Sequence, residues 1–240
     1  MNTAAILILG LPLLCFAFFA LAGISLIPQF LNESSRKRTI WPQFADWSSG
    51  ILTPGGYVQP DMIVGKLNGD PLYVDTTVYG VNHTLVNSTR MRLFYRALRP
   101  VYIVIRTQDM TPITQEDKRL QQVDSGSLGL PSRILVFASE SEIVRSIMDA
   151  QMIVSIGSLQ NVDLQIRRRR NWKTEGVSNS IHEVHILKPG VLTELNDLIG
   201  LYQIVDLLQS KLRELGIAGE MAPQSIPEID YFSSDGAYTE

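Results

Sequence analysis

Residues 62–74 read MIVGKLNGDPLYV, two apolar runs on either side of an Asn68-Gly69 pair. Asn-Gly is the dipeptide that best tolerates the positive φ angles of a type I′ turn. The flanking runs contain the β-branched and aromatic residues that strands favour. This stretch therefore predicts a β-hairpin and makes the surrounding domain a sheet-containing one.

Further strands are expected downstream of the hairpin. Residues 85–95 alternate in part between apolar and polar side chains, and residues 101–105 are rich in β-branched residues. One face of the first run carries Met91, Leu93 and Tyr95, and the other carries Arg90, Arg92, Phe94 and Arg96. With the hairpin, these runs predict an antiparallel meander of four strands.

The second half of the domain mixes strands and helices. Strands are expected over 133–138, 162–166 and 181–187, and a helix is expected to start at 139–142. Between Pro189-Gly190 and Gly216, apolar residues recur at helical spacing and predict a long amphipathic helix packed on the sheet.

The N-terminus is a long uncharged segment. From Ala4 to Pro28 no side chain is charged, and a helix of that length reaches about 38 Å, more than the roughly 30 Å core of a bilayer. We expect a retained transmembrane helix, with a cleaved signal peptide ending at Ala22 as the alternative. Because the basic residues follow the span, the positive-inside rule places the N-terminus outside and the later domain in the cytoplasm.

Two groups of residues are candidates for contact with a membrane surface, where anionic lipid headgroups attract cations and aromatic rings settle at the interface. The first group is Arg36, Lys37, Arg38, Trp41, Phe44 and Trp47, and the second is Arg167, Arg168, Arg169, Arg170, Trp172 and Lys173. In the alternative interpretation, the three aromatic residues cap the core of the domain. The second basic group could equally be a solvated hairpin tip.

The C-terminal segment is acidic. From Ala218 onward it holds five acidic residues and no basic one. Such a segment is either disordered or a docking segment that orders against a partner chain. Its candidate partner-docking side chains are Ile226, Ile229, Tyr231, Phe232 and Tyr238.

No catalytic, cofactor-binding or metal site is recognisable. The only cysteine, Cys15, lies in the N-terminal segment, and no phosphate-binding loop or nucleophile elbow is present. His182 and His185 lie on an expected strand, where an odd spacing places them on opposite faces, so a shared metal is not expected. We therefore predict that the chain is not an enzyme. The net charge of −3 argues against a nucleic-acid partner.

A Gly-x-x-Asn-Gly-x-Pro hairpin (Gly65, Asn68, Gly69, Pro71) follows the single apolar span. With the sheet and the terminal helix, this order of elements resembles bacterial single-pass membrane proteins of unknown function. In architecture alone it is similar to the H subunit of photosynthetic reaction centres. The shared motif is a turn rather than a site, so the resemblance carries over no catalytic residue.

The sequence as a whole predicts an α+β protein, with one N-terminal transmembrane helix and a mostly antiparallel sheet domain that ends in a long amphipathic helix. The expected parts are a span over 1–31, an interfacial segment and linker over 32–60, a cytoplasmic domain over 61–216 and a tail over 217–240. The expected function is a membrane-anchored, non-catalytic subunit or scaffold of an integral-membrane protein complex. The alternative is a tethered small-molecule or lipid-binding sensor domain, with a cleft between the sheet and the 192–212 helix.

Overall fold

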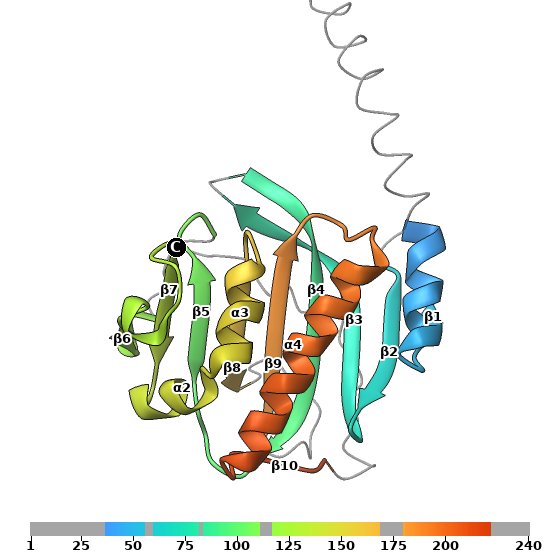
Figure 1. Ribbon diagram of the computed structural model, residues 1–240. Coiled ribbons are helices and arrows are strands. Elements are labelled where there is room, and N and C mark those ends of the chain that lie inside the picture. The colour runs from blue at the N-terminus through green and yellow to red at the C-terminus, as the bar shows by residue number, and fades with distance from the viewer. Residues whose placement is uncertain (1–36, 56–59, 82–83, 111–116, 169–179, 222–240) are drawn as a thin grey trace, which may run out of the picture.

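The computed structural model of the protein describes residues 37–55, 60–81, 84–110, 117–168 and 180–221. These residues form one ten-stranded sheet with four α-helices packed against it (Figure 1). The strand order is β1-β2-β3-β4-β9-β8-β5-β7-β6, and β10 pairs with β4 beside that path. All paired strands run antiparallel.

The first helix covers residues 37–47. The other elements are β1 (Ile51–Thr53), β2 (Met62–Leu67), β3 (Asp70–Val81), β4 (Thr84–Ala97), β5 (Ile103–Thr107), η1 (Asp117–Arg119), β6 (Gln121–Val123), η2 (Gly126–Leu128), β7 (Ile134–Ala138), α2 (Ser141–Ile147), α3 (Ala150–Ser158), β8 (Asp163–Arg168), β9 (Ile181–Pro189), α4 (Leu195–Glu214) and β10 (Ala218–Gly219).

The predicted hairpin at Asn68-Gly69 is confirmed. β2 and β3 pair up to Leu67 and Asp70, and the two turn residues have φ angles of 49° and 91°. The Asn68 side chain donates hydrogen bonds to Asp206 Oδ1 at 2.7 Å and to Gln209 Oε1 at 3.0 Å. The turn is therefore attached to α4 as well as closing the hairpin.

The predicted four-strand meander is wrong at its last step. β4 pairs with β9, and β9 and β8 lie between β4 and β5. The helix-facing side of β9 carries Val184 and Ile186, which pair with Leu93 and Met91. Because the apolar pattern of β9 matches that of β4, β9 can pair with β4 in place of β5, which follows β4 in the sequence.

The helices lie on one face of the sheet, which we call the first face (Figure 1). The long helix α4 packs there, with Leu198, Val205, Leu208 and Leu212 fully buried in the core. The helix over 37–47 belongs to this core as well, and β10 adds to the sheet beyond residue 216. The folded unit is thus larger than the predicted 61–216.

The predicted fold class and cellular placement need correction. Within the residues that the structure describes, no helix is long and apolar enough to span a bilayer. What these residues form is a large antiparallel sheet with its helices. A single-pass membrane protein with an outside N-terminus and a cytoplasmic domain is therefore not supported. The segment for which the span was predicted, residues 1–31, lies outside the described residues.

Candidate functional site

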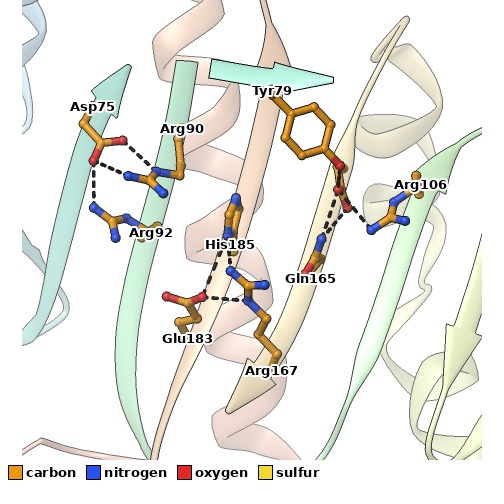
Figure 2. Close-up of polar contacts among 10 residues, drawn as sticks. Asp75, Tyr79, Arg90, Arg92, Arg106, Gln165, Arg167, Glu183 and His185 are labelled. Atoms are coloured by element: carbon orange, nitrogen blue, oxygen red, sulfur yellow. Dashed lines mark hydrogen bonds and ion pairs between the residues drawn. The ribbon is translucent and has the colours of Figure 1, made fainter. Parts of the chain in front are cut away.

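The sheet face opposite the helices, which we call the second face, carries a row of charged side chains across five neighbouring strands (Figure 2). Strand alternation places the side chains of these strands there, because their neighbours in sequence point into the core. Asp117, on η1, joins the row through Arg106. We call the row the charge belt. It consists of Asp75, Arg90, Arg92, Glu183, His185, Arg167, Gln165, Asp163, Arg106 and Asp117.

At one end of the belt, Asp75 on β3 accepts hydrogen bonds from two arginines of β4. Arg90 binds it with Nε at 2.8 Å and Nη2 at 2.9 Å, and Arg92 Nη2 lies 2.7 Å from Oδ2. Asp75 and Arg92 are both buried. Burial by itself would raise the pKa of Asp75, but the charge of Arg92 and the hydrogen bond from Arg90 hold this pKa below its usual value.

In the middle of the belt, Arg167 on β8 connects two residues of β9. Its Nε donates to Glu183 Oε1 at 2.8 Å, and its Nη2 lies 3.1 Å from Nδ1 of His185. Because a guanidinium can only donate, Nδ1 of His185 is the acceptor and the imidazole is neutral. Burial lowers the pKa of His185. The pKa of Glu183 is well below its ordinary value, since the charge of Arg167 outweighs the effect of burial.

At the other end, Asp163 on β8 is fully enclosed by donors. Arg106 Nη2 lies 3.2 Å from Oδ2, and Gln165 Nε2 donates to both carboxylate oxygens at 3.0 Å. The hydroxyl of Tyr79 also donates to Asp163. Arg106 Nη1 in turn binds Asp117 Oδ2 at 3.1 Å. Burial alone would raise the pKa of Asp163. The charge of Arg106 and the hydrogen bond from Tyr79 lower this pKa by more than burial raises it, so the carboxylate stays ionised.

These contacts determine what the belt can do chemically. Its four carboxylates each meet an arginine, its four arginines each meet a carboxylate, and His185 accepts from Arg167. A general acid or base needs a pKa near the working pH, whereas the resolved pKa shifts of the belt carboxylates are all downward. Among the described residues, no group of three His, Cys, Asp or Glu side chains could hold a metal ion. The belt is thus a network of ion pairs that links the strands.

The outer half of the β3–β4 hairpin leaves the sheet. β2 pairs with β3 only as far as Asp75, and the β9 ladder on β4 ends at Thr89, followed by one bridge from Gly190 to Ser88. Residues 76–81 and 84–88 form a two-stranded ribbon, which we call the arm. In Figure 1 the arm bends across the end of the sheet, and in Figure 2 the Tyr79 ring points toward Gln165 and Arg106. Its hydroxyl binds Asp163 on β8.

The outward face of the arm exposes two large apolar side chains beside the polar Asn87. Val78 pairs with Asn87 and Gly80 pairs with Leu85, so Val78 and Leu85 lie on the same face, opposite to Tyr79. Val78 is 58% exposed and Leu85 is 76% exposed. No Asp, Glu, Lys or Arg occurs between residues 76 and 89. The arm therefore presents two large apolar side chains on a stretch of sequence without Asp, Glu, Lys or Arg.

The residues predicted to touch a membrane have other roles where the structure describes them. Trp41 and Phe44 are buried in the core, and Trp41 Nε1 donates to the carbonyl of Leu192 at 3.1 Å. Their burial corrects the interfacial prediction, because no surface of either ring is left for a headgroup. Trp47 is 47% exposed, with its ring stacked on Phe44 and at an edge to Tyr202.

The predicted basic residues divide in the same way. Lys37 Nζ lies 3.1 Å from Asp61 and over the ring of Trp41, Arg38 is exposed, and Arg167 belongs to the belt. Arg168 ends β8 opposite His182. The remaining candidates lie outside the described residues: Arg36, Arg169, Arg170, Trp172, Lys173, Ile226, Ile229, Tyr231, Phe232 and Tyr238.

The space between α4 and the sheet, the position of the alternative ligand cleft, is filled by packed side chains. Leu201, Val205 and Leu208 of α4 are fully buried in one core cluster with Leu93 and Val184 of the sheet. The polar contacts at this interface also have an internal role, because Gln209 Nε2 donates to the carbonyl of Leu67 at 3.1 Å. This packing gives a small-molecule site no support at that position.

Sequence reasoning noted parts of the belt without joining them. It placed Arg90 and Arg92 on one face of a strand and separated His182 from His185, and the register confirms both points. The signal that could have found the rest is the Ile-His-Glu-Val-His run of β9, in which Glu183 and His185 face the same way inside a buried strand. Charged residues in such a strand need partners from neighbouring strands.

Comparison with known proteins leaves the chain without a family. No family model matches it, and no curated protein matches it. Among solved structures, the chain is similar to the crystal structure of the mycobacterial trehalose monomycolate transport factor A, TtfA, at 11% identity and a TM-score of 0.48. The match covers 79% of this chain and 97% of that one. A likeness this distant carries no argument about function.

Proposed function

We propose that this domain is a non-catalytic subunit or scaffold that binds another protein chain through the arm of the β3–β4 hairpin. The observation that carries the proposal is the outward face of the arm, with Val78 and Leu85 exposed on a ribbon free of charged residues. Natural proteins protect exposed strand edges with charged residues, proline or a covering element. A ribbon without Asp, Glu, Lys or Arg that exposes Val78 and Leu85 is instead suited to receiving a partner segment.

The chemistry of the arm defines the partner. A two-stranded ribbon offers backbone N–H and C=O groups along its edges, and an extended segment of another chain can pair with them as an added strand. The uncharged outward face fits apolar side chains from that segment and would disfavour a charged one, which would lose hydration without gaining an ion pair. The expected partner is therefore a protein with an extended, uncharged and apolar segment.

The charge belt supports a binding role in a second way. Tyr79 anchors the arm to Asp163, which Arg106 and Gln165 hold in the middle of the sheet. An arm held in one orientation loses less conformational entropy when it binds than a free hairpin would. Because the belt groups are engaged with one another, their contribution in this proposal is to position the arm rather than to react.

The test is recovery of a partner by the full-length protein purified gently from its native source. Val78→Glu combined with Leu85→Glu places two charges on the arm, and both positions are exposed, so the fold should tolerate them. The matched control is Val154→Glu, at a position on α3 that is 71% exposed. We expect the arm variant to recover at least about tenfold less partner than wild type and the control to recover the same amount.

A photo-crosslinking residue at position 87, on the outward face of the arm, shows whether the contact is direct. The crosslinked protein should disappear in the double glutamate variant. Equal recovery by wild type and the arm variant, or a wild-type protein that purifies as a lone monomer, would contradict the proposal.

A further inference from the structure

A second, separate feature lies at the β10 end of the second face. Met62, Tyr73, Phe94 and Ile181 form a buried apolar cluster there, apart from the main core. Phe94 has no exposed surface, although the helices lie on the opposite face of the sheet. Because no helix lies on that side, other parts of the chain cover the cluster on the second face, and Val64 and Met221 are the described residues that pack against its edge.

The last described residues of the chain lead directly to this cluster. β10 pairs with Arg96 and Ala97 of β4. On the same edge of β4, the preceding residues from Thr84 to Leu93 pair with β3. The chain cannot continue as a strand along that edge, so it leaves the sheet after Gly219. Met221 then packs against the apolar cluster, and its backbone N–H donates to Asp70 Oδ1 at 3.1 Å. Residues 222–240 thus begin beside the cluster.

Charge complementarity points to the same segment. Strand alternation places Lys66 on the second face two residues beyond Val64, and Arg96 on it two residues beyond Phe94. Both cations are exposed, and neither has an ion-pair partner among the described residues. The segment after Met221 contains four acidic residues and no basic one. The cluster is therefore flanked by two cations, and the segment that starts next to it carries the opposite charge.

We propose that residues 222–240 dock on the second face of their own sheet. Ile226, Ile229, Tyr231 and Phe232 supply apolar side chains that cover the cluster, and Glu228 and Asp230 meet Lys66 and Arg96. Nineteen residues reach about 60 Å when extended, whereas neighbouring strands are about 5 Å apart, so the segment can cross the cluster easily. This proposal is independent of the arm and assigns the acidic tail to its own chain.

The test uses the full-length protein and the rate at which chymotrypsin cleaves after Tyr231 and Phe232, because cleavage follows the population in which the tail is undocked. Lys66→Glu combined with Arg96→Glu should speed this cleavage about fivefold, as expected for the loss of two exposed ion pairs. Adding Glu228→Lys and Asp230→Lys to that variant should restore slow cleavage. The control, Lys118→Glu with Arg119→Glu, reverses two exposed cations elsewhere and should leave the rate unchanged.

The remaining outcomes separate the possible occupants. Protection that does not depend on protein concentration supports docking within one chain, and protection that rises with concentration would assign the surface to the tail of a second copy and overturn the proposal. Equal cleavage of wild type and the Lys66→Glu, Arg96→Glu variant would also overturn it, because another segment would then cover the cluster. Neither result depends on Val78 or Leu85, so failure here is distinguishable from failure of the arm.

Discussion

Tyr79 on β3 donates a hydrogen bond to Asp163 on β8, three strands away in the sheet. This contact is possible because the arm leaves the plane of the sheet and bends across β4 and β9 (Figure 2). It connects the exposed ribbon to the charge belt.

Removing that hydroxyl should loosen the arm without unfolding the sheet. In Tyr79→Phe, Asp163 keeps Arg106 and Gln165, so we expect a loss of about 1 kcal/mol in the free energy of unfolding. Amide hydrogen exchange should speed up in 76–81 and 84–88 and stay unchanged in β9. The control is Tyr102→Phe, at the residue that precedes the start of β5. Unchanged exchange in the arm would show that Tyr79 does not anchor it.

The Asp75 end of the belt should be sensitive to loss of a single partner. Asp75→Ala leaves the buried guanidinium of Arg92 without its carboxylate, so we expect a destabilisation of about 3 kcal/mol in urea unfolding. Adding Arg92→Met should recover much of the loss, because the more deeply buried of the two guanidiniums that Asp75 binds is then removed and Arg90 reaches the solvent in part. The exposed pair Glu142–Arg145 serves as the control, and Glu142→Ala should change stability by less than about 1 kcal/mol. Similar effects at the two sites would argue against a buried network.

Stability should decrease as the solution becomes acidic. Burial lowers the pKa of His185 and of His182, so the unfolded chain takes up protons that the folded chain does not. The free energy of unfolding should therefore fall from about pH 7.5 to about pH 5.5. His185→Gln should make this decrease smaller. The lowered pKa values of Asp75, Asp163 and Glu183 predict a further loss below about pH 4.5. An identical slope in wild type and His185→Gln would contradict the assignment of a neutral imidazole.

Two glycine substitutions should act in opposite directions. Gly69 has a φ angle of 91°, so Gly69→Ala is strained even though no atom lies near the added methyl group, and we expect a destabilisation of about 1 kcal/mol. Gly200 lies inside α4 with open space around it, so Gly200→Ala should stabilise the protein by about 0.5–1 kcal/mol. Thermal unfolding of both variants makes the comparison. Stabilisation by Gly69→Ala would show that the turn is not type I′.

The part of the fold that depends on residues close together in the sequence could be predicted from the sequence. The Asn68-Gly69 turn, the two-residue alternation that puts Arg90 and Arg92 on one face, and the helical stripe of α4 are all local patterns. The separation of His182 from His185 follows from the same alternation. The prediction of membrane-facing Trp41 and Phe44 was wrong, because aromatic spacing does not show which surface an aromatic side chain contacts.

The sequence by itself determined which residues point the same way along each strand, because the side-chain period of a strand is a local property of the backbone. Only the tertiary structure decided that β9 and β8 enter between β4 and β5, because several strands carry similar apolar patterns and any of them could pair with β4. That choice brings Glu183, His185 and Arg167 between the Asp75 and Asp163 ends of the belt. It also brings Asp163 within reach of Tyr79, and no spacing in the sequence could indicate a contact between residues 84 positions apart.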